Sequence, residues 1–168
     1  MNKPVRNFRA SIWFGRLLAV LAIGVCVVIS NRMARPDVQT LRLRDGACQI
    51  RELSNDLTIR MQVESESSEF DFRLAGIQVA TSPAARSYLQ QLINDDQLHV
   101  RFDRQRFDDQ NRVLGYLYSG ETSINVELIT LGLARPDPIQ GNSASQQRQY
   151  EKAYQARLDA EGSETIRR

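Results

Sequence analysis

Three stretches of the chain decide the fold: FRLAGIQVATSPAA at residues 72–85, DQNRVLGYLY at residues 109–118, and INVELITLGLA at residues 124–134. The first alternates like a strand and then starts a helix, because Pro83 follows Ser82 and proline is favoured in the first helical turn. The second begins in a polar turn and continues as an apolar strand, and the third leads into a helix. Together they predict a small β domain with helices between and after its strands.

The rest of the chain after its first part fits the same plan. Alternating apolar residues and turn residues predict strands at residues 48–53, 57–63, 70–77, 97–103 and 112–119. Helices are predicted at residues 82–94, 122–133 and 143–160. Five short strands with a helix between the third and the fourth are typical of an OB-type barrel, a partly open Greek key. We therefore expect an α+β, mainly β fold: a five-stranded OB-type barrel with about three helices, preceded by an N-terminal hydrophobic helix.

An apolar segment, IWFGRLLAVLAIGVCVVI, occupies residues 12–29 and is interrupted only by Arg16. Its 18 residues reach the lower limit for a helix that spans a membrane. We predict an uncleaved anchor in a single-pass protein of the cytoplasmic membrane. The domain is expected outside the cytoplasm, because the basic leader before residue 12 has the character of an export signal. The alternative is a signal segment cleaved at Ser30, which would give a secreted protein. Basic residues flank the segment on both sides, so charge alone leaves the orientation open.

The composition fits one globular domain after this segment, since 42% of the 168 residues are hydrophobic and 25% are charged. The expected organisation is a basic leader with the anchor or signal segment at residues 1–34, a linker at 35–46, the barrel domain at 47–160 and a tail at 161–168. Cys26 lies in the apolar segment and Cys48 in the first strand, so neither an intrachain disulfide nor a cysteine metal site is expected.

The net charge of +2 conceals an uneven distribution. Residues 36–168 contain 16 Lys and Arg against 20 Asp and Glu, which gives this part a net charge of −4. Proteins that bind nucleic acids without sequence preference obtain most of their affinity from Lys and Arg contacts to phosphates. The domain is therefore not expected to bind nucleic acids over its whole surface, and a basic site would have to be local.

The three stretches resemble the staphylococcal-nuclease-like family in content, order and spacing. Members of that family carry an RL-G-D-P-E stretch after the third strand, a D-YGR-L-Y stretch around the fifth, and VN--L---GLA in the following helix. A fourth stretch, NDLT at residues 55–58, is similar to the DGDT turn of the family. The resemblance covers about residues 48–158. It implies the barrel fold and cleavage of phosphodiesters, in which aspartates hold Ca²⁺, a glutamate positions water, and two arginines bind the phosphate.

Both arginines of that chemistry have counterparts here. By resemblance alone, Arg73 and Arg112 are the catalytic candidates, since either guanidinium could bind a phosphate with two hydrogen bonds. A structural interpretation stays open, in which these arginines form ion pairs with Asp71, Asp108 or Asp109.

The carboxylates of the family are mostly replaced. Gln78 stands at the aspartate position after the third strand, and Thr81 stands at the glutamate position. Strand alternation puts Leu57 at the aspartate position of the DGDT turn, unless a shift of one residue brings Asp56 there as a weak metal ligand. One aspartate and an amide hold Ca²⁺ poorly, because this hard cation needs several anionic oxygens. No cofactor is expected, and Ca²⁺ would be the cofactor if the protein is active.

These observations predict a membrane-anchored, nuclease-like binding or interaction module without metal-dependent cleavage. Its partners would be the membrane through residues 12–29, single-stranded nucleic acid or another phosphate-bearing ligand, or a protein. The alternative is an active or weakly active Ca²⁺-dependent nuclease that uses Asp56 with replacement ligands such as Gln78. The only histidine, His99, falls on the polar face of a strand and is expected to be solvated rather than a catalytic base.

Overall fold

The computed structural model describes residues 40–137 and 143–166. The predicted membrane segment, residues 12–29, lies outside these ranges. Within the described part, no helix is long and apolar enough to cross a membrane.

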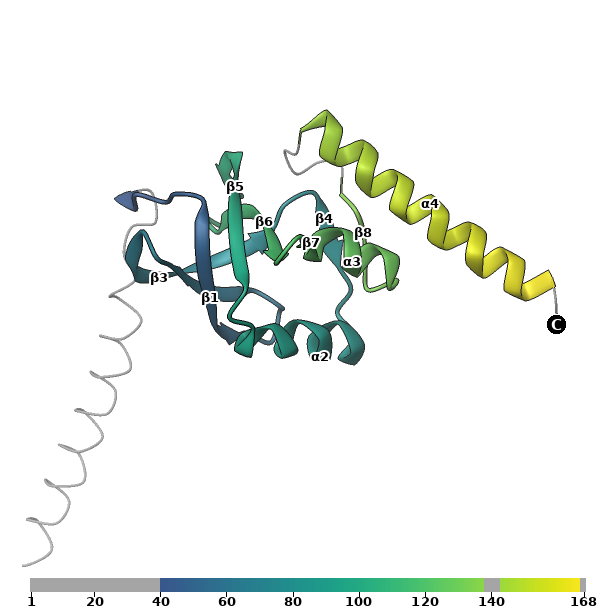
Figure 1. Cartoon of the computed structure of the whole chain (residues 1–168), viewed down its shortest axis with the longest axis horizontal. Coiled ribbons are helices and arrows are strands. Elements are labelled where there is room, and N and C mark those ends of the chain that lie inside the picture. The colour runs from purple at the N-terminus through teal and green to yellow at the C-terminus, as the bar shows by residue number, and fades with distance from the viewer. Residues whose placement is uncertain (1–39, 138–142, 167–168) are drawn as a thin grey trace, which may run out of the picture. The chain divides into compact units, whose positions relative to one another are not determined.

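Five strands close into a barrel, as Figure 1 shows. They are β1 (Gly46–Leu53), β2 (Ile59–Val63), β3 (Glu66–Leu74), β5 (Leu98–Phe107) and β6 (Val113–Ser119). Their order is β3-β2-β1-β5-β6, and a parallel pairing of β3 with β6 closes the ring, while the other pairs are antiparallel. The expected five-stranded OB-type barrel is thereby confirmed.

Alternation along the strands explains the core. Ile59, Met61 and Val63 of β2 point inward and are at most 2% exposed, and Cys48 of β1 is buried. The barrel is so tight at Gly115 of β6 that a Cβ there would lie 2.9 Å from the Phe72 ring. Glycine at this position lets β3 and β6 approach each other closely.

Helices follow the strands in the expected order. After β4 (Ile77–Val79), α2 (Pro83–Gln91) begins at Ser82, whose hydroxyl accepts a hydrogen bond from the Ala85 N–H, and it ends in the 3-10 turn η2 (Leu92–Asn94). The short β7 (Thr122–Ser123) leads into α3 (Ile124–Thr130). The last helix, α4 (Ala144–Ile166), packs against α3 and against β8 (Ala134–Pro136).

Several boundaries differ from the prediction. The polar residues 64–69 are not all loop, because β3 already begins at Glu66 after a two-residue turn from Val63. At its other end this strand stops at Leu74, where Gly76 has a φ of 71°. β5 continues to Phe107, and α4 continues to Ile166 through residues predicted as tail. Hydrophobic alternation predicts only the strand segments that face the core. The residues added at the start of β3 and at the end of β5 are largely polar.

The break at Gly76 has a consequence for the site. It turns β4 out of the barrel and pairs it with β8 in a separate two-stranded sheet, in which Gln78 lies opposite Arg135. This sheet was not predicted, because residues 135–142 looked like a loop.

Candidate functional site

The parallel pairing of β3 and β6 brings the two predicted arginines together. Arg73 lies on β3 opposite Leu114 of β6, and Arg112 directly precedes β6. The side chains of both arginines are partly buried, with 26% and 15% of their surface exposed. The structure therefore brings Arg73 and Arg112 close together, and their role as phosphate contacts stays a prediction.

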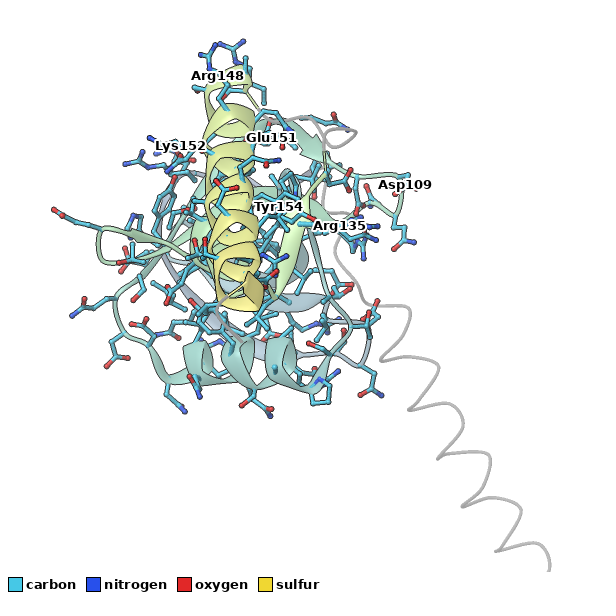
Figure 2. All side chains as sticks on the ribbon, turned by 90° about the vertical axis from the view of Figure 1, so that its right-hand side faces the viewer. Asp109, Arg135, Arg148, Glu151, Lys152 and Tyr154 are labelled. Carbon is cyan, nitrogen blue, oxygen red and sulfur yellow. The ribbon has the colours of Figure 1, made fainter. Side chains whose placement is uncertain are left out.

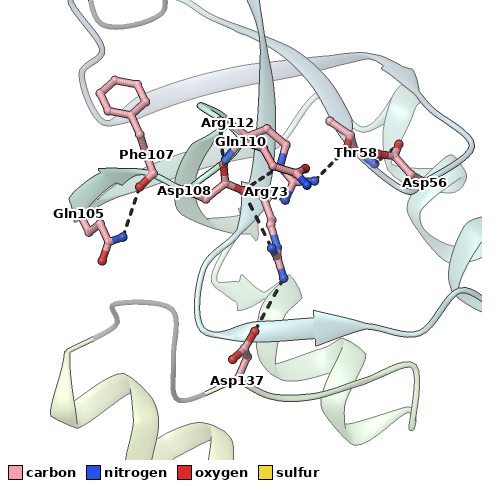
Figure 3. Close-up of polar contacts among 9 residues, drawn as sticks. All are labelled: Asp56, Thr58, Arg73, Gln105, Phe107, Asp108, Gln110, Arg112 and Asp137. Atoms are coloured by element: carbon pink, nitrogen blue, oxygen red, sulfur yellow. Dashed lines mark hydrogen bonds and ion pairs between the residues drawn. The ribbon is translucent and has the colours of Figure 1, made fainter.

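One carboxylate, that of Asp108, forms ion pairs with both guanidinium groups (Figure 3). Asp108 Oδ2 accepts a hydrogen bond from Arg112 Nε at 2.7 Å, forms an ion pair with Arg112 Nη2, also at 2.7 Å, and lies 3.9 Å from Arg73 Nη1. Asp108 Oδ1 accepts from the backbone N–H groups of Gln110 at 3.0 Å and Arg112 at 2.9 Å. Since only 2% of the Asp108 side chain is exposed, this carboxylate is a fixed structural anchor and is not open to solvent.

Arg73 is held much less tightly than Arg112. Its second charged neighbour is Asp137, whose Oδ2 lies 3.7 Å from Arg73 Nη2. Both of its ion pairs are too long for hydrogen bonds, and Arg73 donates no side-chain hydrogen bond within residues 40–137 and 143–166. A guanidinium has five donors, so Arg73 has unused capacity to bind an anion.

Arg112 connects this pair to the predicted metal ligand. Arg112 Nη1 donates to Thr58 Oγ1 at 3.3 Å, and Thr58 Oγ1 donates to Asp56 Oδ2 at 3.0 Å. Asp56 Oδ1 accepts from the Ser54 hydroxyl and from the Thr58 N–H. The hydrogen bond from Ser54 is the main cause that lowers the pKa of the Asp56 carboxyl, and the bonds from Thr58 add to it.

The turn that carries Asp56 has an unusual backbone. Leu57 has a φ of 62°, in the left-handed region, so the strand starts only at Ile59. Arg86 of α2 donates 2.8 Å hydrogen bonds to the carbonyls of Ser54 and Asn55 and ties the turn to the helix. Asp56 thus lies beside the arginine pair with both oxygens engaged by neighbours, and its role as a metal ligand stays a prediction.

Gln78, which stands at the position of the family's aspartate ligand, is hydrogen-bonded to the guanidinium of Arg135. Gln78 Oε1 accepts hydrogen bonds from Arg135 Nε at 2.9 Å and Nη2 at 2.6 Å. Thr81, at the expected glutamate position, is exposed and offers only a hydroxyl. Among the described residues, no group of three or more His, Cys, Asp and Glu side chains is placed to hold a metal ion. The side chains around Gln78 therefore do not fit Ca²⁺, because the fixed guanidinium of Arg135 repels a second cation.

Comparison with known families agrees with this architecture. A family model described as staphylococcal nuclease homologue matches residues 74–162, slightly more than half of the chain. The chain belongs to this family. No curated protein matches it. The resemblance stated from the sequence is thereby confirmed, and the match runs from the end of β3 into α4.

In this staphylococcal nuclease homologue, a buried asparagine bridges the strands that carry the site. Asn125 is 0% exposed, and its Oδ1 accepts from the Leu117 N–H at 3.1 Å while its Nδ2 donates to the Ala75 carbonyl at 3.0 Å. These bonds hold β6 to the residue that follows β3. Asn125 thus stabilises the pairing that brings Arg73 and Arg112 together.

Several sequence candidates lie elsewhere or have other partners. Asp71 forms a 2.9 Å ion pair with Arg60, so Asp108 is the partner of the arginine pair. His99 stacks on Tyr118 with ring centroids 5.0 Å apart. Asp137 and Arg135 were missed, because their place depends on the β4–β8 pairing. The only available signal was the short alternation after the GLA motif of residues 132–134.

Proposed function

We propose that this staphylococcal nuclease homologue binds a phosphate-bearing ligand, foremost single-stranded nucleic acid, without metal-dependent cleavage. The observation that carries the proposal is Arg73, a partly buried guanidinium whose two ion pairs, at 3.9 and 3.7 Å, are too long for hydrogen bonds and which donates no side-chain hydrogen bond within the described residues. A phosphate offers the oxygens that such a group lacks, and charge-assisted bonds to phosphate are among the strongest hydrogen bonds in proteins.

Arg112 has a different part in this site. Its guanidinium donates one hydrogen bond to Asp108 and one to Thr58, and its Nη2 forms an ion pair with Asp108, which together fix the plane of the group. Fixed donors bind a phosphate without a further loss of side-chain entropy. In the proposed complex Arg73 moves the short distance to the ligand, while Arg112 supplies a rigid second contact.

The side chains at the expected metal and water positions disfavour cleavage. Phosphodiester hydrolysis of the kind implied by the family needs a cation and a carboxylate near the attacking water. At the two positions for these groups the chain has Gln78, already bonded to Arg135, and Thr81. Neither can act as a general base at neutral pH.

The second candidate function is weak Ca²⁺-dependent nuclease activity. One observation favours it, because Thr58 places the Asp56 carboxylate within two hydrogen bonds of Arg112. The pKa of Asp56 is lowered, so it is ionised at neutral pH as a metal ligand must be.

The test uses the full chain in detergent with a fluorescein-labelled single-stranded oligonucleotide. Anisotropy measures binding, and a denaturing gel measures cleavage, each with Ca²⁺ and with EDTA. We expect binding without cleavage, weakened about tenfold by Arg73→Gln, and unchanged by Arg148→Gln, which removes an exposed arginine of α4. Cleavage that requires Ca²⁺ and is lost in Arg73→Ala and Asp56→Ala would establish the second candidate, and no binding at all would refute the proposal.

The location of the protein is part of the proposal. Residues 12–29 would anchor the chain in the cytoplasmic membrane, with the barrel on the outer side. The expected result is a full-length protein that stays in the membrane fraction after alkaline extraction and whose barrel is accessible to protease added from outside. A mature N-terminus at Ser30 or Asn31, found by mass spectrometry, would instead show a secreted protein.

A further inference from the structure

We infer that Arg135 is a third phosphate-binding guanidinium of this site, oriented by Gln78, and that it makes the binding of nucleic acid independent of metal ions. The inference rests on the proposed function. It adds that Arg135 supplies the positive charge beside Gln78 that attracts the phosphate.

Arg135 lies on β8, two residues before a partner of Arg73, Asp137. The β4–β8 pairing continues past β8, because the Asp137 N–H donates to the Gly76 carbonyl at 2.9 Å. Residues two apart on a strand point to the same side, with Cα atoms about 7 Å apart. The Arg135 and Asp137 side chains therefore leave the strand on one side, where Asp137 reaches Arg73.

Gln78 fixes one edge of the Arg135 guanidinium and leaves the other edge open. The bonds to Nε and Nη2 use two of its five donors. Gln78 contributes a neutral oxygen, so it orients Arg135 without neutralising it. Arg135 is exposed and, within the described ranges, forms no ion pair, whereas Arg73 and Arg112 each lie near a carboxylate. Arg135 thus keeps its full positive charge at the exposed edge of the site.

The surroundings of Arg135 favour an anionic ligand that extends beyond one phosphate. Only Ser82 separates Thr81 from the start of α2, so the chain has no long loop between these two positions. A single strand whose phosphate binds Arg73 and Arg112 can place a neighbouring phosphate on Arg135. In members of the family that cleave, resemblance implies a divalent cation at this place, and here the guanidinium would supply the charge.

The experiment measures the affinity of the full chain, in detergent, for a fluorescein-labelled oligothymidylate over a range of salt concentrations. Arg135→Gln should weaken binding about tenfold, because a charge-assisted contact is lost. It should also reduce the slope of log affinity against log salt by about 0.7, the value for one phosphate contact of a single strand. Both effects should be equal in Ca²⁺ and in EDTA.

Arg148→Gln is the matched control, since it removes the same charge from an exposed arginine. Figure 2 labels Arg148 near the start of α4, well separated from Arg135. This control should change neither the affinity nor the salt slope. Gln78→Glu provides an independent readout, because a carboxylate there would pair with Arg135 and weaken binding although Arg135 is intact. Arg135→Lys should restore part of the affinity, since the charge remains without the planar donor edge.

The outcomes separate the inference from the proposed function. If Arg73→Gln weakens binding but Arg135→Gln behaves like Arg148→Gln, the third guanidinium is refuted and the proposed function stands. If Arg73→Gln has no effect, the proposed function itself fails. Binding that appears only with Ca²⁺ would overturn the metal-independent site.

Discussion

Asp108 receives one whole edge of the Arg112 guanidinium on a single oxygen, with both Nε and Nη2 at 2.7 Å from Oδ2. The pair is almost closed to water, since the Asp108 side chain is 2% exposed and that of Arg112 is 15% exposed. A buried ion pair costs much desolvation free energy, so it contributes more to geometry than to stability. Here the geometry is that of a fixed guanidinium, Arg112, beside the less tightly held Arg73.

Removing the charge of Asp108 should destabilise the barrel. Asp108→Asn leaves two neighbouring guanidinium groups without their shared counter-ion, and we expect the free energy of unfolding to fall by about 2 to 3 kcal/mol. Urea unfolding followed by tyrosine fluorescence measures the change. Asp109→Asn removes the next, exposed carboxylate and should stay within about 0.5 kcal/mol of the wild type. Equal losses of unfolding free energy in the two variants would mean that the Asp108 carboxylate does not stabilise the barrel.

Asn125 should be needed for closure of the barrel. Asn125→Ala leaves the Leu117 N–H and the Ala75 carbonyl without their partner in a fully buried place. We expect a loss of about 2 to 4 kcal/mol in the free energy of unfolding, since each buried polar group keeps its desolvation cost. The exposed Gln90→Ala on α2 serves as control. A loss no larger than that of the control would contradict the bridging role of Asn125.

Gly115 should tolerate no side chain. In Gly115→Ala the new Cβ would lie 2.8 Å from the Arg101 carbonyl oxygen and 2.9 Å from the Phe72 ring. β6 would have to move away from β3 and β5, and the expected loss is about 1 to 3 kcal/mol in the same urea assay. At Gly46 a Cβ meets no atom within 4 Å, so Gly46→Ala should leave stability unchanged. A neutral effect at Gly115 would show that the two strands are less closely packed than described.

The turn at Asp56 should give a pH-dependent contribution to stability. The folded protein lowers the pKa of Asp56, mainly through the Ser54 hydroxyl. The contribution is therefore present above the pKa of the unfolded chain and is lost as the pH falls through the lowered value. Ser54→Ala should raise the pKa of Asp56 in a carbon-detected NMR titration. Its stability difference from wild type should shrink as the solution is acidified.

Ser67→Ala is the control for that titration, because Ser67 is an exposed residue of β3 away from the turn. It should leave the Asp56 pKa where it is in the wild type. An Asp56 pKa that is the same with and without the Ser54 hydroxyl would contradict the hydrogen-bonded turn.

The sequence predicts the barrel well because two kinds of local signal agree. Apolar alternation places β2 and β6 within two residues of their ends, and the Ser82-Pro83 pair places the start of α2. Where a strand carries polar residues, as β3 does at its start, this signal is absent and the prediction is too short.

The site was only partly predictable, for a physical reason. Arg73 and Arg112 could be assigned by motif, and Asp108 was one of three acidic candidates four residues or fewer from an arginine. Choosing among these candidates needed the register of β3 against β6. Arg135 could not be assigned at all, because its contact with Gln78 arises from two three-residue strands that are far apart in the chain.

Calcium binding itself tests the central claim most directly. Isothermal titration of Ca²⁺ into the full chain, in detergent and without oligonucleotide, should give no saturable heat and no rise in melting temperature, because Arg135 holds the Gln78 oxygen. Gln78→Asp alone should not change this, since the new carboxylate would pair with Arg135. Saturable Ca²⁺ binding by the wild type that disappears in Asp56→Ala would contradict the account.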